Sequence, residues 1–399
     1  MALTLSRKAM AVKPSSTLAI TAKAKEMKAN GIDVVGFGAG EPDFNTPKNI
    51  CNAAVKALDE GFTKYTPVAG TLELRKAICD KFLKFNNLKY EPDQIVVSNG
   101  GKHSLANVFS AILNPGDEVI IPAPYWLSYP EMVRLSDGVP VYIRADKSQN
   151  YKVTAKQIEE ACTEKTKAFI LNSPNNPSGM VYTKEELEAI AEVAIKKDFY
   201  VVADEMYEYL IYGDEKHISI ASLNDEIYKR TITCSGLSKS YSMTGWRIGY
   251  TGSTKEIAKL MSSVQSHLAS NPNSIAQKAA YEALIGPQDF VHEMKNEFEK
   301  RRDYMYERIA GMKHISAVKP QGAFYMFIDI SGVLGKSYKG QKIGSVDTMA
   351  TVLLEDYKVA VIPCNDFGFD DHIRLSYAIS IEQIKKGMDR IESFLNDLS

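Results

Sequence analysis

The sequence predicts an α/β fold, in which a mostly parallel, seven-stranded sheet lies between layers of helices and a smaller α+β unit lies beside it. Two observations predict this fold. Between about residues 48 and 285, short apolar runs alternate with helical stretches, as in chains built from repeated strand–helix units. After about residue 285 the pattern changes to a long charged helical segment with few strands. Parallel strands joined by helices need cover on both faces, so we expect a buried sheet.

The amino-terminal segment is predicted to be an arm, too small for a domain. Ser15 and Ser16 suit the N-cap of an amphipathic helix over residues 17–30, and Asn30 with Gly31 suits its end. A short strand is expected over residues 32–37.

Seven strands are then expected, at residues 94–97, 118–122, 139–143, 168–171, 199–203, 231–234 and 248–251. Helices fall between them, such as residues 183–197, where Thr183 and Glu186 form a capping box. The last part should hold a helix over 288–312, strands over 323–330 and 359–362, and a helix from Ile381. We therefore divide the chain into an arm with part of the small domain (1–47), a large domain (48–285) and the remainder of the small domain (286–399).

The composition excludes several classes of protein. The 48 Lys and Arg residues balance 49 Asp and Glu residues, so nothing favours nucleic acid or an anionic membrane as partner. The five cysteines form no CxxC pair, no apolar run reaches the roughly 18 residues that span a bilayer, and the start lacks a signal-peptide core. We therefore expect a cytoplasmic protein with reduced thiols. The six histidines show no HxxxH spacing, so no metal site is expected.

Chemically active side chains follow three of the predicted strands. Asn176 lies in the polar stretch after the strand that ends at Leu171, while Asp204 and Tyr207 follow the next strand. Lys239 comes shortly after the strand that ends near Cys234. Open α/β sheets bind ligands at the carboxyl ends of their strands, so we expect these side chains to converge.

This set of groups meets the needs of a pyridoxal cofactor. Such a cofactor requires an amine for covalent attachment, a carboxylate that keeps the pyridine nitrogen protonated, and donors that polarise the ring hydroxyl. Lys239 and Asp204 suit the first two roles, and Tyr207 with Asn176 suits the third.

The phosphate and the ring of that cofactor also have candidate partners. Gly100, Gly101 and Lys102 open a predicted helix, whose amino terminus can bind a phosphate together with the guanidinium of Arg247. Trp126 lies where it can stack on the ring. Ser235 and Ser238 are both open as phosphate contacts.

Residues 236–249, with the sequence GLSKSYSMTGWRIG, resemble the pyridoxal-phosphate attachment signature of class I aminotransferases along their whole length. The resemblance extends over nearly the entire chain, through the segments 38–44, 65–67, 124–126, 175–179, 204–207 and 372–376. It implies the type I fold of pyridoxal-phosphate transferases, with a small domain built from both ends of the chain.

The resemblance also implies roles for further residues. In this family the position of Arg374 holds the substrate α-carboxylate, helped by Gly40, Asn176 and Trp126. The position of Tyr65 reaches the cofactor phosphate of the neighbouring subunit, which implies a homodimer with shared active sites. The substrates would be an amino acid and a 2-oxo acid, exchanged by ping-pong kinetics.

Within the family, the segments 13–15, 100–102 and 243–246 resemble the bacterial-type aspartate aminotransferases. The resemblance implies L-aspartate as donor, 2-oxoglutarate as acceptor and Lys102 as the cation for the second carboxylate. A lysine is a flexible point charge, so discrimination should be looser than with arginine. Prephenate or aromatic aminotransfer and β-lyase chemistry stay open as alternatives.

Two rivals of other classes fit the sequence less well. A cofactor-binding protein without catalysis would not need the complete set of reacting groups. A nicotinamide dehydrogenase would need a dinucleotide fingerprint, whereas the glycines of residues 36–40 lack its spacing and precede Glu41 and Pro42.

Overall fold

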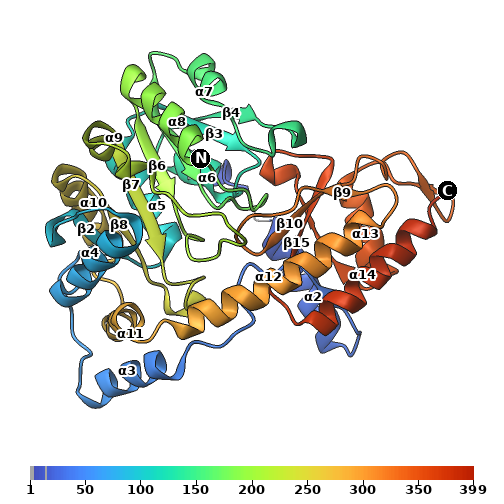
Figure 1. Ribbon diagram of the computed structural model, residues 1–399, viewed down its shortest axis with the longest axis horizontal. Coiled ribbons are helices and arrows are strands. Elements are labelled where there is room, and N and C mark those ends of the chain that lie inside the picture. Colours follow the sequence, from blue (N-terminus) through green and yellow to red (C-terminus); the bar gives the residue numbers. More distant parts are fainter. Residues whose placement is uncertain (1–3, 14–15) are drawn as a thin grey trace.

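A computed structural model describes residues 4–13 and 16–399. Its centre is a seven-stranded sheet with the order β2-β8-β7-β6-β5-β3-β4, in which only β8 runs antiparallel to its neighbours (Figure 1). The strands are β2 (Ile95–Ser98), β3 (Glu118–Ala123), β4 (Val139–Arg144), β5 (Thr166–Asn172), β6 (Tyr200–Asp204), β7 (Thr231–Gly236) and β8 (Gly249–Gly252). The predicted seven-stranded, mostly parallel sheet is therefore confirmed.

Helices cover both faces of this sheet because its strands are apolar on both sides. On β5, Ala168 and Ile170 pack toward one layer of helices, while Phe169 and Leu171 pack toward the other. The first layer holds α5 (Gly101–Ile112), α6 (Ser128–Leu135) and α10 (Lys255–Leu268). The second layer holds α7 (Ala155–Ala161), α8 (Lys184–Lys197) and α9 (Asp225–Arg230). The capping box of Thr183 and Glu186 is present at the start of α8.

Three further helices, α3 (Lys48–Asp59), α4 (Leu72–Asn86) and α11 (Ser274–Ile285), pack together beside the β2 edge. The chain also contains a short helix near its start, α1 (Arg7–Met10). Lys8 of this helix forms an ion pair with Asp137. No helix within residues 4–13 and 16–399 is long and apolar enough to cross a bilayer.

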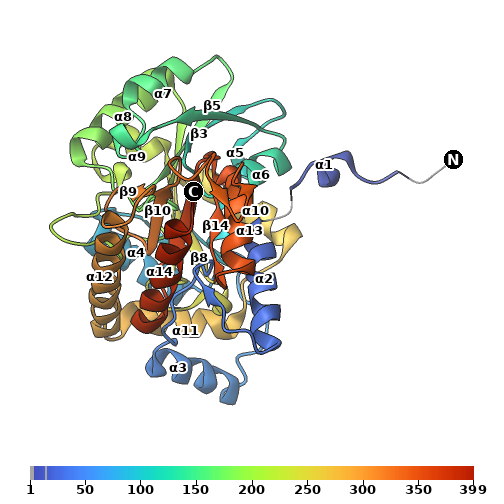
Figure 2. The same cartoon turned by 90° about the vertical axis from the view of Figure 1, so that its right-hand side faces the viewer.

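A second unit lies beside the large sheet and combines both ends of the chain (Figure 2). Its four-stranded sheet has the order β14-β15-β10-β9, with β14 (Ile362–Pro363), β15 (His372–Ser376), β10 (Tyr325–Asp329) and β9 (Ser316–Ala317). A separate pair joins β1 (Val35–Gly36) to β13 (Val359–Ala360), and a small hairpin joins β11 (Ser337–Tyr338) to β12 (Gln341–Lys342). The helices are α2 (Ser16–Ala29), α12 (Asp289–Ala310), α13 (Val346–Glu355) and α14 (Ile381–Asn396).

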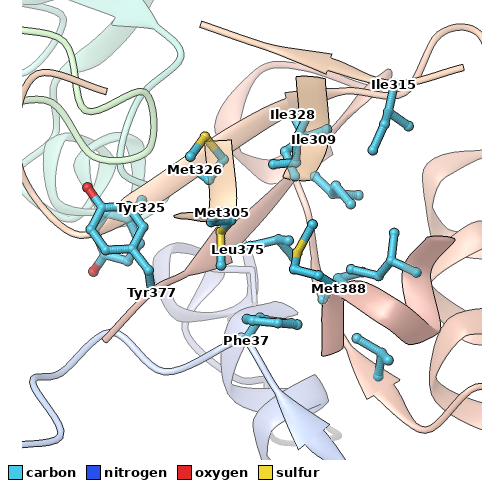
Figure 3. Packing of buried hydrophobic residues seen from close by; sticks show 14 of the residues in the cluster. Phe37, Met305, Ile309, Ile315, Tyr325, Met326, Ile328, Leu375, Tyr377 and Met388 are labelled. Carbon is cyan, nitrogen blue, oxygen red and sulfur yellow. The ribbon is translucent and has the colours of Figure 1, made fainter. Parts of the chain in front are cut away.

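One hydrophobic core unites these distant segments. Phe37, from the amino-terminal part, packs among residues such as Met388 of α14 and Leu375 of β15 (Figure 3). The close packing of Phe37 on α14 requires glycine at position 387, because a Cβ there would lie 2.3 Å from the Phe37 ring. The amino-terminal strand is thus held by the carboxyl-terminal helix.

Several predicted boundaries differ from the structure. The strand expected over 32–37 has only two paired residues, and the one expected over 359–362 divides into β13 and β14, which join different sheets. Strand β15 was identified in the sequence only as a motif, because its burial on both faces hides any alternation. The expected N-cap Ser15 lies outside the described residues.

Candidate active site

A cavity of about 550 Å³ lies at the carboxyl ends of β5, β6 and β7 and extends to the second unit. The predicted site residues that line it are Gly40, Gly101, Lys102, Trp126, Asn176, Asp204, Tyr207, Lys239, Arg247 and Arg374. These residues come from segments as far apart in the chain as Gly40 and Arg374. The sheet topology brings them together, as expected from the strand ends.

Lys239 lies three residues beyond the end of β7. Its side-chain amine donates a hydrogen bond of 2.5 Å to the carbonyl oxygen of Gly40. Burial lowers its pKa to about 8, and the charges of Arg374 and Arg247 act in the same direction. A sizeable fraction of this amine is therefore neutral near pH 8, as a nucleophile or proton acceptor must be.

The carboxylate of Asp204 is buried at the end of β6. Tyr129 of α6 donates to its Oδ2 at 2.6 Å, and the backbone N–H of Met206 donates to its Oδ1 at 3.2 Å. Burial raises the pKa of Asp204 to about 6, although these two donors favour the charged form. At neutral pH the group is thus mostly a carboxylate, which can pair with a ligand cation.

Sequence reasoning missed Tyr129. Its ring is also in edge contact with Trp126, with centroids 5.4 Å apart. Its place three residues after a predicted site tryptophan was a signal that could have pointed to it.

The hydroxyl of Tyr207 lies 3.0 Å from that of Tyr325, a second residue that the sequence did not reveal. Burial raises the pKa of Tyr207 well above its ordinary value, so its hydroxyl keeps its proton. Tyr325 belongs to β10. The central carbon of the Arg374 guanidinium lies over its ring, 4.3 Å from the ring centre.

Arg374 projects from β15 into the cavity with donors to spare. Its Nη1 donates to Oδ1 of Asn176 at 3.0 Å, and its Nη2 donates to the carbonyl of Gly38 at 3.4 Å. The Nε group is buried and has no hydrogen-bond partner within the described part of the chain. A buried donor without a partner is costly, so this guanidinium suits a carboxylate ligand.

An anion cradle lies where α5 begins. Gly100 has φ of +89° and precedes Gly101, the first helical residue. This positive φ favours glycine at position 100, and a Cβ there would also lie 2.3 Å from the Arg247 guanidinium, which would have to shift. Backbone N–H groups at a helix start beside a guanidinium are suited to a phosphate.

The two serines left open by the sequence differ in position. Ser238 lines the cavity. Ser235 is buried in β7 and donates to Glu208 at 2.5 Å instead.

Two further lysines line the cavity besides Lys239. The amine of Lys102 lies 5.0 Å from the centre of the Trp126 ring, and partial burial lowers its pKa. Lys25, which the sequence did not single out, reaches the cavity from α2 together with Thr21. The spacing of four residues places both on one helix face, a signal that the predicted helix already contained.

Tyr65 does not line the cavity of its own chain. Its side chain is 90% exposed, which leaves it free to contact another molecule.

One group of carboxylates and a histidine comes together in the structure, although the sequence shows no metal-ligand spacing. The ligand atoms of Glu205, Glu208 and His217 lie within 4.8 Å of one another behind the cavity. The spacing did not reveal this because the three residues approach only through the turn that follows β6. The ammonium of Lys81 bonds to Glu208 and already supplies a cation there.

A comparison with known protein families agrees with this fold and cavity. The family described as aminotransferase class I and II matches residues 32–391. The chain belongs to that family and is therefore a transaminase. It is 51% identical to an aspartate aminotransferase of Bacillus sp. (strain YM-2), over 98% of this chain and 99% of the relative. It is 48% identical to an aspartate/prephenate aminotransferase of Cereibacter sphaeroides, over 97% of this chain and 98% of the relative.

Solved structures of similar proteins have the same fold. The aspartate aminotransferase of Rhizobium meliloti superposes with a TM-score of 0.96 at 41% identity, covering all of both chains. That of Thermus thermophilus with maleate superposes with a TM-score of 0.93 at 42% identity, covering 99% of this chain and all of the other.

Proposed function

We propose that this transaminase uses pyridoxal phosphate to move the amino group of L-aspartate to a 2-oxo acid such as 2-oxoglutarate. The observation that carries the proposal is the presence in one cavity of the Lys239 amine, the Asp204 carboxylate and the Arg374 guanidinium. The names of the relatives support aspartate as the donor.

The residues present fit the cofactor. The cradle at Gly100 and Gly101 with Arg247 would hold its phosphate, Asp204 would face its ring nitrogen, and Lys239 would carry it covalently. When bound, pyridoxal phosphate supplies an electron sink for the negative charge that develops at the substrate α-carbon.

The residues of this chain would then share the work of the reaction. Arg374 binds the α-carboxylate through its spare donors and so orients the substrate. The Lys239 amine, once displaced by the substrate amine, would take a proton from the substrate α-carbon and deliver it to the cofactor carbon to which the amine had been attached. Tyr207 and Asn176 would donate hydrogen bonds to the ring hydroxyl, and Trp126 would stack on the ring. The 2-oxo acid leaves before the second substrate binds, which gives ping-pong kinetics.

We further infer that the enzyme is cytoplasmic and that it forms a homodimer with shared active sites. The exposed side chain of Tyr65 supports this inference, since it would reach the cofactor phosphate of the partner. In each protomer the large domain would be residues 48–285, and the small domain would combine residues 1–47 with 286–399. The pairing of β1 with β13 and the core that holds Phe37 support this division.

The proposed function is tested by product analysis. Purified protein should be yellow, aspartate should bleach the visible band, and 2-oxoglutarate should restore it with formation of glutamate. Release of ammonia from aspartate without glutamate would favour a β-lyase instead. Faster transfer to prephenate than to 2-oxoglutarate would favour the activity named in several relatives.

The specificity for a second carboxylate should depend on Lys102. Replacing Lys102 by alanine should raise KM for aspartate about fivefold, because one partly exposed ion pair is lost, and leave KM for a monocarboxylic amino acid unchanged. Lys25→Ala should act in the same direction. Lys28→Ala is the matched control, since this exposed lysine of α2 does not line the cavity. Equal changes for both substrates would contradict this role.

A further inference from the structure

A cluster of buried charged and polar side chains lies directly behind the cavity, on the segment that carries Asp204 and Tyr207. Glu205 and Glu208 belong to this segment, and their side chains are only 4% and 1% exposed. Lys81 and Asn86 reach them from α4, Ser219 and His217 from the chain that follows, and Ser235 from β7.

Each carboxylate in the cluster has several donors. Glu208 accepts from the Lys81 ammonium, from Asn86 at 2.7 Å and from Ser235 at 2.5 Å. Glu205 accepts from Asn86 at 3.0 Å and from Ser219 at 2.6 Å, and its Oε2 lies 2.9 Å from Nε2 of His217. Buried charges persist only when they are paired in this way.

The segment is fixed at two places, one on each side of Tyr207. At its start, the N–H of Glu205 donates to the carbonyl of Cys234 in β7 at 2.8 Å. At its end, the backbone turns so that the side chain of Glu208 meets Ser235, one residue further along the same strand. The same strand leads to Lys239. The segment that carries Asp204 and Tyr207 and the segment that carries Lys239 are therefore both attached to β7.

We propose that Glu208 is a positioning residue for amino-group transfer, since its bond from Ser235 sets Tyr207 against the strand that leads to Lys239. This inference rests on the proposed function. Lys81 balances the charge of Glu208, and Ser235 forms the tether. Neither touches the cavity, so both act through Tyr207.

Two double variants separate the tether from the charge. Lys81→Met with Glu208→Gln removes both charges but keeps an oxygen that accepts from Ser235. Lys81→Met with Glu208→Leu removes the charges and that acceptor. Ser235→Ala removes the tether, together with a hydrogen bond to Tyr250, and leaves the ion pair intact. Glu299→Gln is the control, because it weakens a partly buried ion pair with Arg302 in α12, away from the cavity.

Wild-type protein is first shown to be yellow and to transfer amino groups, so that a failure of the proposed function is recognised separately. Three quantities are then compared: kcat, the pH at which the visible band changes, and amide hydrogen exchange of residues 204–208 in protein stripped of cofactor. We expect the Leu double variant and Ser235→Ala to lose about tenfold in kcat, to shift the pH of the band and to exchange faster. The Gln double variant and Glu299→Gln should match the wild type in all three.

The proposal is overturned if Ser235→Ala and the Leu double variant both keep the wild-type kcat and band. It is equally overturned if the Gln double variant loses as much as the Leu double variant, since charge alone would then be responsible. Should neither double variant fold, Ser235→Ala decides, because it leaves no buried charge unpaired.

Discussion

Replacing Lys239 by alanine should abolish amino-group transfer. In the proposed reaction this side chain provides both the covalent attachment for the cofactor and the proton carrier at the substrate α-carbon, and no other described lysine lies at this position in the cavity. Turnover is measured as glutamate formed from aspartate and 2-oxoglutarate. A variant that keeps a tenth of the wild-type rate would refute the assignment.

Two controls separate this loss from misfolding and from a simple loss of charge. In protein stripped of cofactor, burial lowers the pKa of Lys239 from 10.5 to about 8, so its protonation opposes folding increasingly as the pH falls from 10.5 to about 8 and fully below that. Stripped of cofactor, the Lys239→Ala protein should therefore melt no lower than the wild type in the same state. Lys239→Arg keeps a cation, but the guanidinium does not deprotonate and should be equally inactive.

Replacing Asp204 by asparagine should lower kcat by about 10² to 10³, the usual cost of removing a preorganised electrostatic partner of a developing charge. Asparagine fills the same space but cannot hold a protonated ring nitrogen. The variant should also release pyridoxal phosphate more readily during dialysis. Its rate is compared with that of Asp198→Asn, an exposed aspartate at the end of α8. Unchanged kcat in the Asp204 variant would contradict its role.

The variant Tyr129→Phe tests the same carboxylate with a smaller change. The hydroxyl of Tyr129 favours the charged form of Asp204, so its removal should raise the pKa of that carboxyl further above about 6. The acid limb of the pH–rate profile should then move to higher pH, with a smaller loss in kcat than in Asp204→Asn. A profile that moves to lower pH would show that the hydrogen bond does not stabilise the carboxylate.

The cavity depends on both units of the fold. Lys239 and Asp204 come from the large sheet, whereas Arg374 and Tyr325 come from the four-stranded sheet of the second unit. The groups proposed to hold the cofactor are therefore separate from the principal group proposed to hold the substrate carboxylate. Relative movement of the two units would change substrate binding without displacing Lys239 from the cofactor.

Local patterns in the sequence determined the large sheet and most of the cavity. Apolar runs that end in polar residues placed Asn176, Asp204 and Lys239 at strand ends, because parallel strands all finish at one edge of a sheet. The alternation along β6 even indicates the side to which Asp204 points. Val202 packs toward the layer that contains α6, and a residue two further along a strand faces the same way.

Only the tertiary structure decided which distant side chains meet. Tyr129 bonds to Asp204 across 75 residues, Ser235 bonds to Glu208 and leaves the cavity to Ser238, and Tyr325 lies against Tyr207 across 118 residues. Such contacts depend on how helices and a second sheet pack against the strand ends. Sequence periodicity describes one element at a time, so it specifies the face on which a side chain lies but not its partner on another element.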